Sequence, residues 1–147
     1  AALLKISYDL GKLDSRHEAS HEEILQCVED NPGLVDAVEF ANTVARRTDC
    51  PPSIVAFTFF TFAQLDLQQA AEFWVAAADK VGLAAGDPVI ALTNRFAEAR
   101  RNRERLTKRM YLSAIFRAWN YRRAGRPLRL LKINSPAGGL IPIPEPS

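Results

Sequence analysis

Arginine and lysine side chains gather in residues 95–132, and their type suits the binding of phosphate groups. Thirteen of the nineteen Lys and Arg residues lie there with only two acids, Glu98 and Glu104, which gives a formal charge of +11. Eleven of the thirteen are Arg. A guanidinium group donates two parallel hydrogen bonds to phosphate oxygens and tolerates partial desolvation, so this bias favours contact with a polyanion over mere solubility.

Nine of these basic residues are candidates for contact with a nucleic-acid backbone: Arg100, Arg101, Arg103, Arg105, Lys108, Arg109, Arg122, Arg123 and Arg126. If about six basic residues contacted phosphates of duplex DNA, the logarithm of the affinity would fall against the logarithm of the salt concentration with a slope of about −5. Tyr111, Phe116 and Tyr121 alternate with the basic residues and could stack on the nucleobases of a single strand. Their helical spacing instead favours a place in the hydrophobic core. Without a helix-turn-helix spacing, we do not expect sequence-specific recognition.

The remainder of the chain is acidic, which leaves a second interpretation of the basic stretch open. Residues 1–94 carry six basic and fourteen acidic side chains, a formal charge of −8, and the last fifteen residues add −1. The net charge of +2 therefore conceals a separation of charge that can mark a polyanion-binding surface. Alternatively, the bases pair with these acids and form a solvated face of the protein's own fold.

A second motif suits different chemistry, hydrolysis at a zinc ion. Residues 17–21 match His-Glu-x-x-His, in which two imidazoles bind zinc and the Glu polarises water, and Glu39 could supply a third ligand. The motif requires one helix through all five residues, whereas Ser20 with Glu23 forms a capping box that starts a helix after His17. A small zinc metallopeptidase is therefore the second alternative, and we expect neither an enzyme nor a cofactor.

The elements that position these residues are predicted to be helices. The 147 residues, 48% hydrophobic and 24% charged, are typical of one soluble globular domain. Residues 54–65 contain four Phe and would suit a buried strand as well as a helix. We predict a helix, because no second strand candidate lies nearby to pair with it. Helices are expected to start at Ser20, Pro32, Asp66 and Asp87-Pro88, and helix ends are expected at Gly11, Gly82 and Gly125.

The predicted fold is all-α: a compact bundle of about six to seven short helices over residues 1–133, followed by an extended Pro-rich tail. Residues 134–147 contain four Pro and two Gly, which excludes a helix. The tail could bind a partner protein, but its apolar Leu140, Ile141 and Ile143 favour a strap over the domain itself. Cys27 and Cys50 are expected to be reduced, half-buried thiols.

No signal peptide or membrane span is recognisable, and we expect a cytoplasmic protein that does not contact a membrane. The chain begins with Ala rather than Met. Either an initiator Met has been removed or the chain is part of a longer polypeptide.

Three segments, GLAAGDPVIALTNRF, AIFRAWNYRRAGRPLRLLKI and IPIPEP, resemble the C-terminal helical region of phage and prophage proteins that begin with a ParB-like, sulfiredoxin-like domain. The resemblance covers roughly residues 20–147, and its most specific pieces are Gly86-Asp87-Pro88 and Ala118-Trp119-Asn120 with Gly125. It implies association with DNA, a structural role for Trp119 and Asn120, and a ParB-like domain as a possible partner. The motif of that domain, of the Asp-Gly-Gln-His-Arg type, is not in this sequence.

The sequence thus predicts a helical domain that binds nucleic-acid backbone through residues 95–132, with DNA favoured over RNA. Its expected context is the accessory part of a ParB-like phage or plasmid protein. The first alternative is a protein–protein interaction module of a phage and host system.

Overall fold

The computed structural model describes residues 1–15, 18–133 and 139–147, and every regular element in these ranges is a helix. In chain order the elements are α1 (Ala2–Asp9), α2 (His21–Asp30), α3 (Gly33–Val44), the short 3-10 helix η1 (Ala45–Arg47), α4 (Pro52–Ala63), α5 (Leu67–Asp79), α6 (Pro88–Arg101) and α7 (Lys108–Arg123). The predicted all-α class is confirmed. No helix in these ranges is long and apolar enough to cross a membrane.

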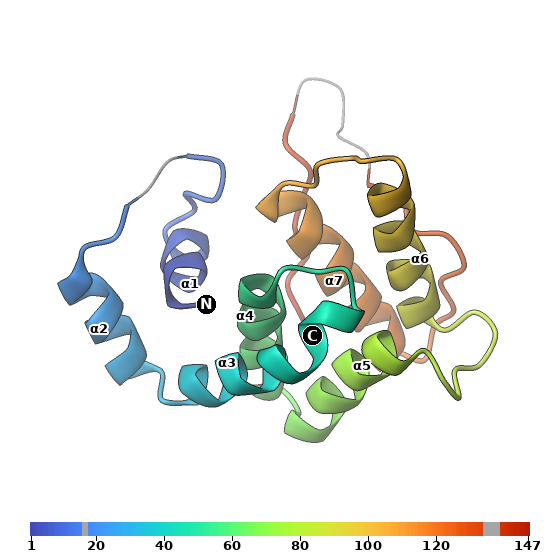
Figure 1. The fold of residues 1–147 in the computed structure, drawn as a ribbon, viewed down its shortest axis with the longest axis horizontal. Helices are drawn as coiled ribbons and strands as arrows, with labels where there is room; N and C mark the ends of the chain where they lie inside the picture. Colours follow the sequence, from blue (N-terminus) through green and yellow to red (C-terminus); the bar gives the residue numbers. More distant parts are fainter. Residues whose placement is uncertain (16–17, 134–138) are drawn as a thin grey trace.

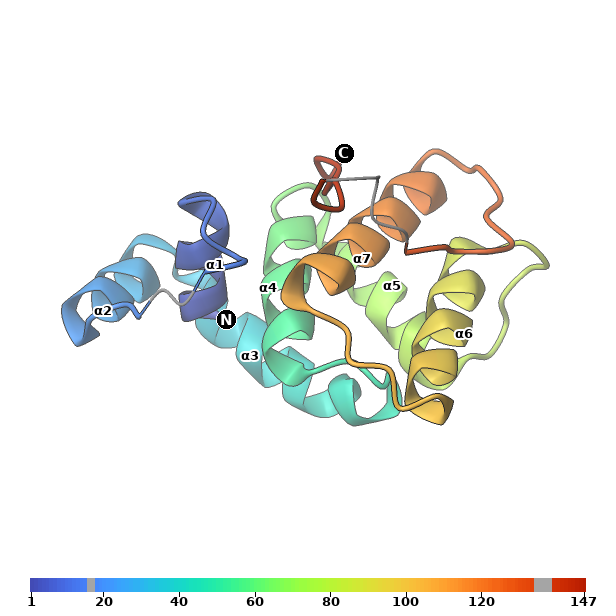
Figure 2. The same cartoon turned by 90° about the horizontal axis from the view of Figure 1, so that it is seen from above.

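Helix α4 lies at the centre of the bundle, with α1, α3, α5 and α7 packed around it (Figures 1 and 2). This segment, which could have been a strand, is a helix as predicted and is buried on nearly every side. Phe62 of α4 stacks on Trp119 of α7 with ring centroids 4.1 Å apart, and Phe73 of α5 meets both rings edge-on. Burial of each Phe ring stabilises the fold by about 1.5–3 kcal/mol, so α7 is held firmly against the core.

Helix starts follow the local capping signals of the sequence. Ser20 Oγ accepts a hydrogen bond from the Glu23 N–H (3.1 Å), and the Glu23 carboxylate accepts one from the Ser20 N–H. Asp66 and Asp87 cap α5 and α6 through their carboxylates. Each such cap stabilises its helix by about 1 kcal/mol.

Two details differ from the predictions. Helix α5 ends earlier than the predicted stop at Gly82, because Lys80 already takes the left-handed conformation (φ 57°). Both thiols are free as predicted, but only Cys27 is half-buried, whereas Cys50 is buried and burial raises its pKa.

Residues 127–133 follow α7 without helix and contact the loop that precedes α6. The Leu128 N–H donates to the Gly86 carbonyl (2.9 Å), and Leu128 and Leu131 are buried. Gly86 has a φ of +83°, and a Cβ there would lie 3.3 Å from Pro127 Cβ. The positive φ, together with this tight contact, therefore favours Gly at this position.

The described part of the tail, residues 139–147, contacts α7 along its length. Ser113 Oγ donates to the Pro142 carbonyl (2.9 Å), and the Asn120 amide donates to the Glu145 carbonyl (2.8 Å). Trp119 Nε1 donates to the Ser147 carbonyl (3.1 Å). These contacts fit the structural role that the resemblance implied for Trp119 and Asn120, while residues 134–138 lie outside the described ranges.

Candidate nucleic-acid interface

Helices α6 and α7 form a hairpin whose connection carries the densest group of bases. We call residues 100–108 the basic loop; it includes the last two residues of α6 and the first residue of α7 (Figures 1 and 2). Its five basic residues are exposed: Arg100, Arg101, Arg103, Arg105 and Lys108. Within the described residues only Arg100 of these five makes an ion pair, at 2.8 Å from Asp49, and its side chain is still 77% exposed.

The basic loop begins with a tight helix end that usually requires glycine. The Arg103 N–H donates to the Arg100 carbonyl (3.3 Å), and the Glu104 N–H donates to the Ala99 carbonyl (2.8 Å). This pair of bonds is a Schellman motif, and it places Arg103 in the left-handed conformation with a φ of 52°. An L-residue there costs about 1 kcal/mol, so the loop holds a mildly strained arginine.

Glu104, the acidic residue of the basic loop, forms an ion pair with Arg95, which lies outside the loop. Both Glu104 carboxylate oxygens accept hydrogen bonds from the Arg95 guanidinium, at 2.9 and 2.7 Å. The Arg95 hydrogen bond holds the pKa of Glu104 below its ordinary value. The pair ties the loop to α6, and Glu104 makes no ion pair with the loop bases.

The start of α7 adds to the positive field. Thr107 caps the helix by accepting from the Met110 N–H (3.2 Å), and Lys108 and Arg109 occupy the first turn, which has no acid. A helix N-terminus carries about half a positive charge, so each cation there destabilises the helix by about 0.3–1 kcal/mol. The sequence therefore places positive charge where the helix dipole opposes it.

Three of the nine candidate residues are engaged inside the fold. Arg109 pairs with Asp14 (2.9 Å) and donates to the Ile141 carbonyl (3.0 Å). Arg122 lies 3.4 Å from an Asp87 oxygen.

Arg123 is the third. It lies 3.7 Å from an Asp66 oxygen, donates to the Gln69 side chain and the Ser147 carbonyl, and covers the Trp119 ring. Arg109, Arg122, Arg123 and Arg100 thus pair with acids of residues 1–94, as the second interpretation of the basic stretch predicts. The other basic residues of the basic loop have no such partner among the described residues.

The interleaved aromatic rings have mixed environments. Phe116 is fully buried, as its helical spacing indicated. Tyr121 is half-buried, with the Arg126 guanidinium 4.4 Å and the Arg117 guanidinium 5.8 Å from its ring centroid. Arg126, the ninth candidate residue, is exposed and held over this ring rather than over an acid.

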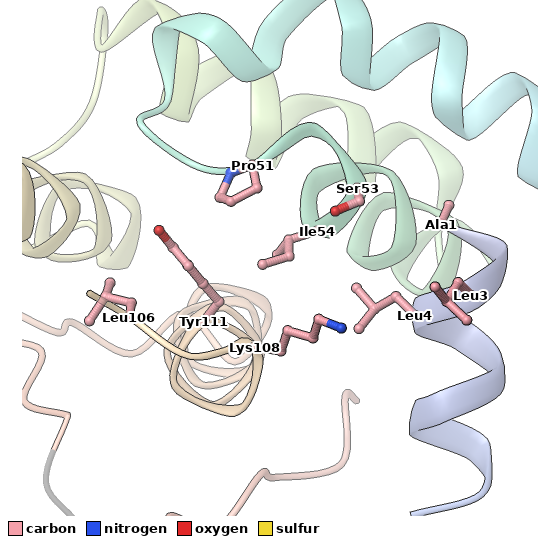
Figure 3. Close-up of a pocket in the computed structure, with 9 residues that line it drawn as sticks. All are labelled: Ala1, Leu3, Leu4, Pro51, Ser53, Ile54, Leu106, Lys108 and Tyr111. Atoms are coloured by element: carbon pink, nitrogen blue, oxygen red, sulfur yellow. The ribbon is translucent and has the colours of Figure 1, made fainter. Parts of the chain in front are cut away.

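A cavity of about 260 Å³ opens beside the basic loop (Figure 3). Its walls come from α1, α4, α7 and the loop: Ala1, Leu3, Leu4, Pro51, Ser53, Ile54, Leu106, Lys108 and Tyr111. Burial, with a smaller effect of the Cys50 and Asp49 charges, raises the pKa of Tyr111 and keeps its phenol protonated. Sequence reasoning missed this cavity, because its walls are about fifty residues apart in the chain and no local pattern joins them.

The zinc motif gains no geometric support within the described residues. Helix α2 begins at His21, so Glu18 precedes the helix, and His17 lies outside the described ranges. Across residues 1–15, 18–133 and 139–147, no group of three or more His, Cys, Asp or Glu side chains could hold a metal ion. Glu39 is exposed on α3.

Comparison of the chain with family models, with curated proteins and with solved structures found no match. The basic loop and the cavity beside it are therefore the features of the molecule that bear on its function.

Proposed function

We propose that the protein binds the sugar–phosphate backbone of nucleic acid, with DNA favoured, through the basic loop. One observation carries the proposal: Arg101, Arg103, Arg105 and Lys108 lie within eight residues, are exposed, and make no ion pair with any described residue. Phosphate oxygens accept from guanidinium and ammonium groups without base-specific contacts. The protein therefore binds backbone without reading sequence.

Three unfavourable features coincide at the basic loop. Like charges crowd together, cations lie at the positive end of α7, and Arg103 takes a conformation that suits glycine. Each feature destabilises the free protein by up to about 1 kcal/mol. A bound polyanion would relieve the first two, which is why their coincidence supports function rather than a solvated face.

The resemblance to the helical region of ParB-like phage proteins points the same way. In that context this domain is the accessory part that holds DNA, and a ParB-like domain is its partner.

The test removes four loop charges together. We expect the variant with Arg101, Arg103, Arg105 and Lys108 replaced by Ala to lose at least about 100-fold in affinity for labelled DNA, measured by fluorescence anisotropy at low salt. The matched control replaces four exposed bases elsewhere, Lys12, Arg46, Arg129 and Lys132, and so changes the net charge equally.

The control variant should keep most of its affinity. An equal loss in both variants would mean that only net charge matters, and no binding by the parent protein would overturn the proposal. Thermal unfolding of both variants checks that each is folded.

A further inference from the structure

The cavity beside the basic loop is mostly apolar, with three polar side chains on its wall. Its walls include Leu4 and Ile54, both buried. In Figure 3, Lys108 extends from α7 toward Leu4 of α1, Tyr111 extends toward Pro51 before α4, and Ser53 lies on α4 across from Lys108. Across the described residues, the Ser53 hydroxyl, the Lys108 ammonium and the Tyr111 phenol make no side-chain hydrogen bond. A mostly apolar pocket with a few polar groups on its wall is the usual form of a small-ligand site.

We infer that this cavity receives an unpaired base, so that the protein prefers single-stranded nucleic acid. The inference rests on the proposed function and extends it to the kind of strand. A base has an apolar face and polar edges, which suits apolar walls bearing hydroxyl and ammonium groups. The cavity, at about 260 Å³, is large enough for one flat ring system and not for a base pair with its neighbours.

The cavity and the basic loop share residues, which connects a base with its own phosphate. Leu106 and Lys108 belong to both, and Arg105 precedes them. A nucleotide whose base enters the cavity therefore has its phosphate beside the loop cations. Duplex DNA buries its bases in the stack, and releasing one costs a few kcal/mol. The geometry thus favours a strand whose bases are already free.

The test compares three labelled ligands of equal length: a single DNA strand, the same strand with all bases removed, and the duplex. We expect the single strand to bind about tenfold more tightly than the abasic strand, which offers the same phosphates. The duplex should bind no more tightly than the abasic strand at equal phosphate concentration. Equal binding of the normal and abasic strands, or preference for the duplex, would overturn the inference.

Two substitutions test the cavity itself. Ser53 is exposed at the start of α4, so Ser53→Trp can fill the cavity without disturbing the core. We expect it to reduce single-strand affinity to the abasic level and to leave abasic binding unchanged. The control is Gln68→Trp, at an exposed position of α5 that does not line the cavity. Tyr111→Phe removes only the phenol oxygen, and a severalfold loss confined to the normal strand is expected. Unchanged single-strand affinity in both variants would contradict the assignment.

Failure of this inference is distinguishable from failure of the proposed function. If the cavity variants have no effect while the fourfold loop variant still loses binding, the loop binds backbone and the cavity has no part in it. If the loop variant binds every ligand like the parent, the proposed function itself is wrong.

Discussion

Both ends of α7 are rich in basic residues but place them in different environments. At its start, the basic loop leaves four of five bases without an ion pair among the described residues. At its end, Arg122 and Arg123 contact acids and the tail, and Arg126 covers an aromatic ring. Similar charge densities thus have different surroundings at the two ends. Ion pairing separates the surface that we propose to bind a ligand from the structural one, which composition alone does not.

The backbone also differs between the basic loop and the end of α7. Helices α6 and α7 both end in Schellman motifs, with Arg103 (φ 52°) and Gly125 (φ 67°) at equivalent positions. The structural end has the residue that suits the conformation, whereas the loop end has an arginine there. We interpret the arginine as retained for its charge at a small cost in stability.

The largest effect on stability is expected at the structural end. Asp87→Ala removes both the cap on the Val89 N–H (2.9 Å) and the contact with Arg122. We expect the free energy of unfolding to fall by about 1–2 kcal/mol, measured by urea denaturation.

DNA affinity should not change in this variant. Asp87→Asn retains the cap and should lose only a few tenths of a kcal/mol. A large loss of DNA binding by either variant would remove the distinction between the two ends.

Exchanging the residues of the two Schellman motifs should shift stability in opposite directions. Arg103→Gly relieves the left-handed strain and should raise the free energy of unfolding by about 0.5–1 kcal/mol while it weakens DNA binding. Gly125→Arg should lower it by about 1 kcal/mol. Paired denaturation curves check both changes, and a destabilised Arg103→Gly protein would show that the Arg103 side chain is structural.

Substitution of single arginines by Ala should show that the two ends of α7 differ in their contribution to stability. Arg123→Ala loses contacts with Asp66, Gln69 and Ser147, and should cost about 0.5–1 kcal/mol of stability. Arg105→Ala should alter stability by less than about 0.5 kcal/mol, because no described residue pairs with it. Equal losses from both deletions, measured by thermal unfolding, would contradict the assignment of Arg105 to ligand binding.

The smallest expected effect is a pH dependence of the stability that the Arg95–Glu104 ion pair contributes. Arg95 lowers the pKa of Glu104 from its ordinary 4.5, so this pair stabilises the fold above that pH. The contribution is lost as the pH falls through the lowered pKa. Glu104→Gln should therefore show a slightly weaker decline of Tm between pH 5 and 3 than the parent protein. Identical declines would show that the pair contributes nothing.

Helix type and most helix starts could be predicted because their signals are local. The Ser20 and Asp87 caps need only residues two or three positions away. The helical state of α4 followed from the absence of a partner strand. The early end of α5 could not be predicted, because Lys80 takes a conformation that a nearby Gly82 suits better.

The sequence could not predict which basic residues form ion pairs within the protein. Arg109 pairs with Asp14, ninety-five positions away, and Arg122 with Asp87, thirty-five positions away. These partners meet only through the packing of α7 against the core. The sequence therefore identified the basic stretch, and the fold separated its free residues from its engaged ones.

The salt dependence of DNA binding, measured for single variants, tests the central claim most directly. The four loop cations without an ion pair predict a slope of log affinity against log salt of about −2.8 for a single strand and −3.6 for duplex DNA. Arg105→Ala should make the slope shallower by about 0.7–0.9, and Arg122→Ala should leave it unchanged. Equal slope changes in the two variants, or none in Arg105→Ala, would contradict the account.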